Sequence, residues 1–148
     1  MSLLRVSIAL AALAVSAIPA RADLKAAMAE QDLGRRSKLA LDNAAVALKS
    51  AREAYNKDER DKVAASVNEI VESVDLASSS LKATGKNPRK SPKWFKAAEM
   101  ATRDLLKRLE TFQHDLSFEE RGMLDKARSR TQEVHDELLL GLMKGRKR

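Results

Sequence analysis

Apolar residues recur every three or four positions along most of this 148-residue chain, and this spacing constrains the fold more than any other feature. The clearest stretch places six apolar side chains on one face of a helix: Val63, Val67, Ile70, Val74, Ala77 and Leu81. Similar stripes occur within residues 41–55, 94–116 and 124–141. Strand signals are missing, because there is no sustained alternation and few glycines or prolines to form turns. The pattern predicts an all-α protein.

Capping residues divide this pattern into four helices. We expect them at about residues 24–56, 59–84, 92–116 and 118–144. Asp58 is the expected N-cap of the second helix, and Gly85 suits the left-handed position that follows its end. Ser91, which precedes a proline, is the expected N-cap of the third helix. The segment Ser117–Glu120 has the S-x-x-E pattern of a capping box, which predicts the start of the fourth.

Short connections between these helices favour an antiparallel up-down-up-down four-helix bundle. The first helix is the weak point, because the segment Gly34-Arg35-Arg36-Ser37 can interrupt it. Leu24–Leu33 would then be a separate helical piece or a loose arm. A three-helix core with a mobile N-terminal segment is the alternative fold.

The core of such a bundle must be built mainly from Leu, Val and Ala, since the chain has only three Phe, one Trp and one Tyr. Alanine-rich faces allow helices to pack closely. Trp94 falls on the apolar stripe of the third helix. We therefore expect it to plug one end of the bundle and not to stack on a ligand.

The N-terminus has the pattern of a secretory signal peptide, which we assign to residues 1–22. Arg5 supplies the positive charge, an apolar run covers Val6–Ile18, and Ala20-Arg21-Ala22 is a small-residue cleavage site. Cleavage there would leave one mature helical domain, residues 23–148. The apolar run is shorter than the roughly 20 residues that cross a bilayer. We expect a basic, soluble protein that is periplasmic or secreted and does not span the membrane.

Positive charge is concentrated between the second and third expected helices, where six basic residues occur without an acid. These are Lys82, Lys86, Arg89, Lys90, Lys93 and Lys96. The start of the third helix lies beside them, and the free N–H groups and dipole of a helix start attract anions. We expect an anion-binding site made of Lys86, Arg89, Lys90 and Lys93. A solvated loop that only aids solubility is the alternative.

Residues for catalysis or metal binding do not form a recognisable set. There is no cysteine, so disulfides and thiolate ligands are excluded. The di-iron pattern Glu-x-x-His fails at both histidines, since Thr111 and Gln132 occupy the glutamate positions. Neither a Gly-x-Ser-x-Gly turn nor a phosphate-binding glycine loop is present. We therefore expect a protein without enzymatic activity, bound metal or cofactor.

Two histidines remain as weak candidates. In the expected bundle His114 and His135 lie roughly 20 Å apart along the helices, so they cannot share one metal. We expect His114 on the surface and His135 half-buried at the edge of its stripe. An exported bundle with a methionine near its start and a histidine in its last helix is similar in outline to soluble b-type cytochromes, which hold haem between Met and His. His135 is therefore the weak cofactor candidate. In the expected bundle, however, Met28 lies roughly 16 Å from His135 along the bundle axis, and Met100 points away from the apolar stripe of its helix.

Two segments, Gly85–Lys93 and Gln132–Gly141, resemble an uncharacterised family of exported bacterial helical proteins. This resemblance implies export and a helical fold, and it implies no activity. We expect a structural or interaction protein whose partner is an anionic envelope component or another protein, with haem binding as the alternative function. A homodimer is possible through a spare apolar edge. Nucleic acid is not expected, because no groove-reading or base-stacking motif occurs.

Overall fold

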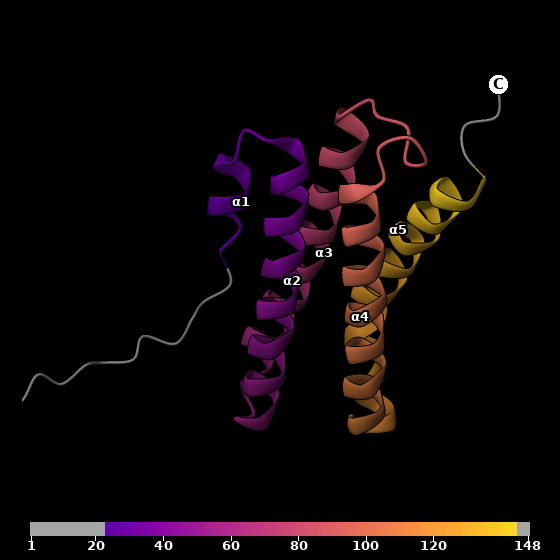
Figure 1. Cartoon of the computed structure of the whole chain (residues 1–148). Helices are drawn as coiled ribbons and strands as arrows, with labels where there is room; N and C mark the ends of the chain where they lie inside the picture. Colours follow the sequence, from indigo (N-terminus) through magenta and orange to yellow (C-terminus); the bar gives the residue numbers. More distant parts are fainter. Residues whose placement is uncertain (1–22, 145–148) are drawn as a thin grey trace, which may run out of the picture.

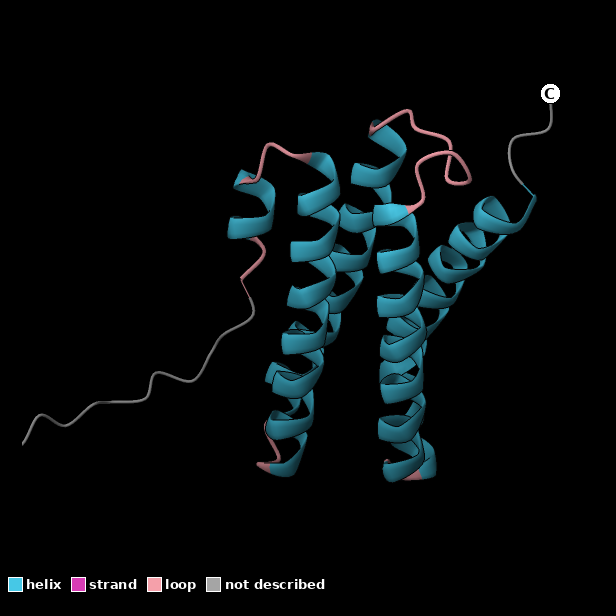
Figure 2. Ribbon diagram, viewed as in Figure 1, coloured by secondary structure: helices cyan, strands magenta, loops and turns pink. Residues whose placement is uncertain are grey.

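The computed structural model describes residues 23–144, and this part of the chain is helical and contains no strand (Figure 1; Figure 2). Its elements are α1 (Lys25–Ala29), α2 (Leu33–Asn56), α3 (Arg60–Ala83), α4 (Lys93–Asp115), the 3₁₀ helix η1 (Phe118–Leu124) and α5 (Asp125–Lys144). The all-α prediction is confirmed. Within residues 23–144 no helix is both long enough and apolar enough to cross a membrane.

The four long helices form a bundle of two helix pairs, α2 with α3 and α4 with α5. The two pairs join through contacts of α2 with α4 and of α3 with α5. In Figure 1 the connection within each pair lies at the bottom, whereas the loop between α3 and α4 lies at the top. The C-terminal end of α5 is also at the top, where α5 leans away from α4. The loop and the last turn of α5 therefore belong to the same end of the bundle.

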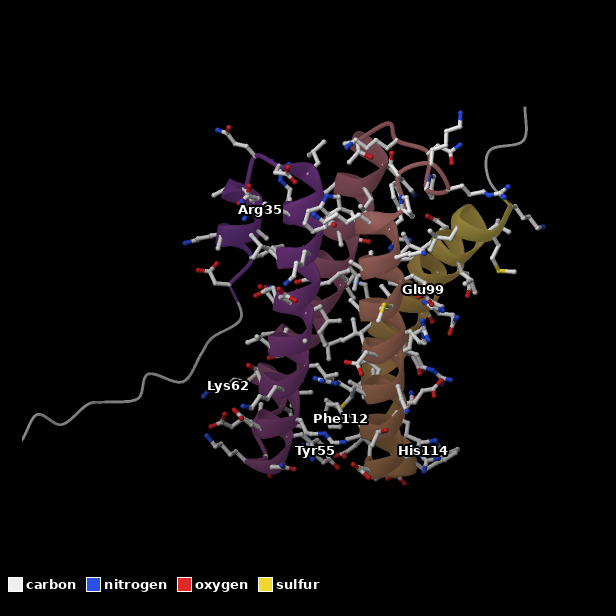
Figure 3. All side chains as sticks on the ribbon, viewed as in Figure 1. Arg35, Tyr55, Lys62, Glu99, Phe112 and His114 are labelled. Carbon is white, nitrogen blue, oxygen red and sulfur yellow. The ribbon has the colours of Figure 1, made fainter. Side chains whose placement is uncertain are left out.

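The core follows the apolar stripes of the sequence. All six stripe residues from Val63 to Leu81 are buried, and Leu124, Val134 and Leu138 are buried on α5. Four alanines of α2 are completely inaccessible: Ala40, Ala44, Ala47 and Ala51. Their small side chains allow close packing of α2 against its neighbours, and aromatic rings pack together at the lower end of the bundle. Tyr55 and Phe112 pack edge to face there, with ring centroids 5.9 Å apart (Figure 3).

The first expected helix, 24–56, is divided into α1 and α2. The break lies at residues 30–32, where the Asp32 carboxylate accepts the N–H of Arg35 at 2.8 Å and caps α2. Gly34, expected to interrupt the helix, is instead a buried residue of α2. The segment before the break is a separate helical piece, held by the burial of Ala27 and by contacts of α1 with α2. The alternative of a three-helix core is not observed.

The N-caps expected for α3 and α4 are wrong. Asp58 has φ 60° and lies in the turn, and Glu59 is the N-cap of α3 without a side-chain hydrogen bond. Ser91 is displaced by Pro92, which precedes α4 and also provides no capping side chain. Both helices are held by packing of their apolar faces and not by a capping side chain. Gly85 is confirmed as the left-handed residue after α3, with φ 65°.

The expected capping box at Ser117–Glu120 does not form. Ser117 makes no side-chain cap, and the chain passes into the 3₁₀ helix η1, so the α-helix begins only at Asp125. The Glu120 carboxylate instead accepts hydrogen bonds from the Tyr55 hydroxyl at 2.6 Å and from Arg60 at 2.7 Å. A contact between helices therefore replaces the local cap. The expected signal peptide, residues 1–22, lies outside the described residues.

Candidate functional site

The loop between α3 and α4, at the upper end of the bundle (Figure 1), carries three of the four candidate anion-binding residues, and the fourth, Lys93, begins α4. Gly85 reverses the chain with its positive φ. Asn87 then fixes a tight turn: its carbonyl accepts the N–H groups of Lys90 and Ser91, and its side chain accepts that of Arg89 at 2.9 Å. The turn is stabilised through the backbone, so the basic side chains remain directed to solvent.

Lys86, Arg89, Lys90 and Lys93, which we call the basic pole, are all exposed. None of the four forms an ion pair with a carboxylate among residues 23–144. Elsewhere most arginines are paired, as Arg103 is with Glu99. The positive charge of the loop is therefore not neutralised locally, as binding of an anion requires.

The basic pole adjoins the start of α4. This helix has no side-chain N-cap and no acid in its first turn, so its dipole adds to the positive potential of the loop. The ammonium of Lys93 lies 4.7 Å from the centre of the Trp94 ring. Trp94 itself is partly buried against the core, as expected for a plug at the end of the bundle.

A groove of about 370 Å³ opens beside the basic pole, between α3 and α5, and we call it the α3–α5 groove. Its apolar lining comes from α3, the loop, α4 and α5: Leu81, Pro88, Phe95, Val134 and Leu138. Three charged groups also line it. The Lys82 ammonium and the Glu137 carboxylate form an ion pair at 2.9 Å that links α3 to α5, and Lys86 belongs to the basic pole. The groove thus combines apolar walls with a basic rim.

His135 belongs to a polar cluster between α4 and α5, where it is largely buried. Its Nδ1 lies 3.1 Å from the Thr102 hydroxyl, which also bonds the carbonyl of Ala98 at 2.9 Å. Its Nε2 lies 4.0 Å from the Glu99 carboxylate. Glu99, labelled in Figure 3, accepts two hydrogen bonds from Arg103, and these raise the pKa of the guanidinium. The cluster links the two helices.

The structure does not bring the sequence-derived ligand candidates together. His114 is exposed near the lower end of α4, far from the loop (Figure 3). Met28 and Met100 are 61% and 63% exposed, so neither is buried against His135. Among the residues that the structure describes, no three His, Asp or Glu side chains form a group that could hold a metal.

Two features of this region were missed from the sequence. Glu99 is a buried acid, and its signal was its position beside Ala98 on the stripe with Arg103 one turn later. The α3–α5 groove has no local signal, since it depends on the angle at which α5 leaves the bundle.

The sequence and the structure were compared with known proteins, and no protein-family model, curated protein or solved structure matches the chain. The resemblance carried by Gly85–Lys93 and Gln132–Gly141 therefore gives no support to a function. The physical chemistry of the basic pole and its groove is the basis for the proposals below.

Proposed function

We propose that this protein is a non-enzymatic, exported interaction module that binds anionic components of the cell envelope through its basic pole. The observation that carries the proposal is a set of four exposed cations, three in the α3–α4 loop and one at the first residue of α4, none of which is paired with an acid among residues 23–144. The proposal includes cleavage of residues 1–22, a periplasmic or secreted location, and an antiparallel up-down-up-down order of the long helices.

Electrostatics support an anion as the ligand. The loop contains no acid, and the nearest carboxylate of the groove, Glu137, is engaged by Lys82. Clustered like charges create a local potential that attracts counter-ions over about one Debye length, near 8 Å at physiological salt. Lys144 ends α5 on the same side of the bundle (Figure 1). Attraction to this end should therefore depend steeply on ionic strength.

The test is a binding screen of residues 23–148 against anionic vesicles and an acidic polysaccharide at several salt concentrations. The site variant replaces Lys86, Arg89, Lys90 and Lys93 by alanine. The matched control replaces four other exposed residues that form no ion pair among residues 23–144: Lys57, Lys107, Arg121 and Lys126. Both variants lose the same net charge, so they separate a local site from general attraction.

Binding that weakens with salt and is lost only in the site variant would support the proposal. Equal loss in both variants, or binding that neither variant changes, would contradict it. Addition of haem to the same protein tests the alternative function. An absorption band near the Soret region that disappears in a His135→Ala variant would favour a cofactor-binding bundle.

A further inference from the structure

We infer that the ligand of the basic pole is a single-chain anionic amphiphile, such as a long-chain fatty acid. Its alkyl chain would occupy the α3–α5 groove, and its headgroup would lie against Lys86 at the rim. This inference rests on the proposed function, because it gives the anion bound at the basic pole a chemical class.

The walls of the α3–α5 groove suit an alkyl chain. Leu81, Phe95, Val134 and Leu138 are core residues from three different helices, and the groove reaches down to them. Its volume, about 370 Å³, lies at the lower end of the range for small-molecule sites. Apolar ligand atoms gain free energy there because they leave water without leaving polar groups unsatisfied.

A close contact between the loop and α5 forms part of the lining of the groove. A Cβ atom at Gly141 would come within 3.2 Å of the Pro88 ring, so the missing side chain allows the loop to approach the helix. The basic pole is thereby held at the groove. A headgroup and a chain can be bound by the same few residues of the loop and of α5.

The charges at the rim select the headgroup. Lys82 and Glu137 neutralise each other at 2.9 Å, and Lys86 remains as an unpaired positive charge among residues 23–144. The ion pair is more than half exposed on both sides, so it can rearrange around a ligand at little cost. Charge complementarity therefore favours a carboxylate, sulfate or phosphate head over a neutral or cationic one.

A second surface groove, of about 640 Å³, lies between α2 and α4 and provides the natural comparison. Its apolar lining comes from α2 alone: Ala45, Val46 and Leu48. Two of its four basic residues, Arg52 and Arg108, are held by aspartates. The α3–α5 groove is favoured because its apolar lining comes from three helices and the loop, whereas that of the α2–α4 groove comes from one helix.

The experiment is calorimetric titration of residues 23–148 with octanoate, decanoate and dodecanoate below their micelle concentrations. Burial of each added methylene should tighten binding about 4-fold. Dodecyltrimethylammonium, with the same chain and the opposite charge, should bind more weakly. Acetate carries the headgroup alone and should bind weakly.

Two variants locate the site. Ser78→Leu places a larger side chain in the lining of the groove, and Lys86→Glu reverses an exposed charge that the fold does not need. Both should weaken dodecanoate binding at least 10-fold. Ala45→Leu enlarges a half-buried side chain in the lining of the α2–α4 groove and should have no effect on dodecanoate binding. Circular dichroism confirms that each variant is folded.

An affinity that does not change from octanoate to dodecanoate would overturn this inference. The proposed function would remain supported if the binding of acidic polymers were still lost in the basic-pole variant. Loss of dodecanoate binding in Ala45→Leu but not in Ser78→Leu would also overturn the inference, as would binding only to anionic bilayers. Tight dodecanoate binding that depends on Ser78 and Lys86 would support the inference. It would do so even if acidic polymers did not bind and the proposed envelope function were therefore wrong.

Discussion

The indole ring of Trp94 lies directly against the backbone of Gly34, so that a Cβ at position 34 would fall 2.2 Å from its Cδ1 and Nε1 atoms. Gly34 is a buried residue of α2, and Trp94 lies in the first turn of α4. The contact joins the two helix pairs at the end of the bundle that carries the basic pole. The glycine is required for close approach and does not break the helix.

Gly34→Ala should therefore destabilise the protein, although alanine in place of a helical glycine normally adds about 1 kcal/mol. Overpacking against a ring costs typically about 1–3 kcal/mol, and the clash here is severe. Chemical denaturation of the variant should show a lower unfolding midpoint. Gly122→Ala is the control, since its Cβ would meet only the Asp125 carboxylate at 3.8 Å. A stabilised Gly34→Ala variant would contradict the contact.

Thr102→Val should cost about 1–3 kcal/mol, because it leaves the Nδ1 of the largely buried His135 without its hydrogen-bond partner. The two side chains have nearly the same shape, so the change removes polarity and not volume. Thr111→Val provides the comparison, since Thr111 is exposed and bonds only the carbonyl of Lys107. Urea denaturation of both variants measures the difference. Equal effects would mean that the Thr102–His135 bond contributes nothing.

Glu120 should make stability depend on pH. The hydrogen bond from Tyr55, and then the charge of Arg60, hold the pKa of its carboxyl below the ordinary value. A lowered folded-state pKa stabilises the fold fully above the unfolded-state value of about 4.3, and this contribution is lost as the pH falls through the folded-state pKa.

The measurement is the difference in unfolding midpoint between the native chain and Glu120→Gln from pH 7 to pH 3. We expect a constant difference at neutral pH that shrinks below about pH 4. Glu119→Gln, at an exposed position that forms no ion pair within residues 23–144, should show no such change. A difference that grows on acidification would have the wrong sign for this contact.

Asp58→Val should lower stability by about 1–2 kcal/mol, because Asp58 has φ 60° and a β-branched residue adopts this conformation poorly. Asp58→Gly relieves that constraint and should be tolerated. Lys57→Val, at the neighbouring position with φ −91°, is the control. Thermal unfolding of the three variants provides the comparison. Similar losses at both positions would show that the backbone conformation is not the cause.

The local spacing of apolar residues was sufficient to predict the long helices and most of the buried core. The stripe from Val63 to Leu81 is buried as predicted, and Gly85 ends α3 in the expected conformation. The residues of the basic pole were also found from the sequence, because a run of basic residues without an acid is visible there. Because these basic residues lie outside the apolar stripes of the helices, their side chains were expected to be exposed.

The caps were predicted least well. Asp58, Ser91 and Ser117 have the right chemistry for N-caps, but none of them caps a helix. Asp32 does cap α2, although the interruption of the first helix was expected two residues later, at Gly34. A cap contributes about 1 kcal/mol, so the packing of a whole helix can shift its first residue at little cost.

The sequence by itself determined that the chain is helical, which face of each long helix is buried and where positive charge gathers, because these properties depend on residues near one another along the chain. Only the tertiary structure decided that Trp94 rests on Gly34, that Glu120 joins Tyr55 and Arg60, and that a groove opens beside the basic pole. Those relationships join residues that are distant in sequence, and they depend on how the helices cross and where α5 leaves the bundle. No local pattern of residues encodes such angles.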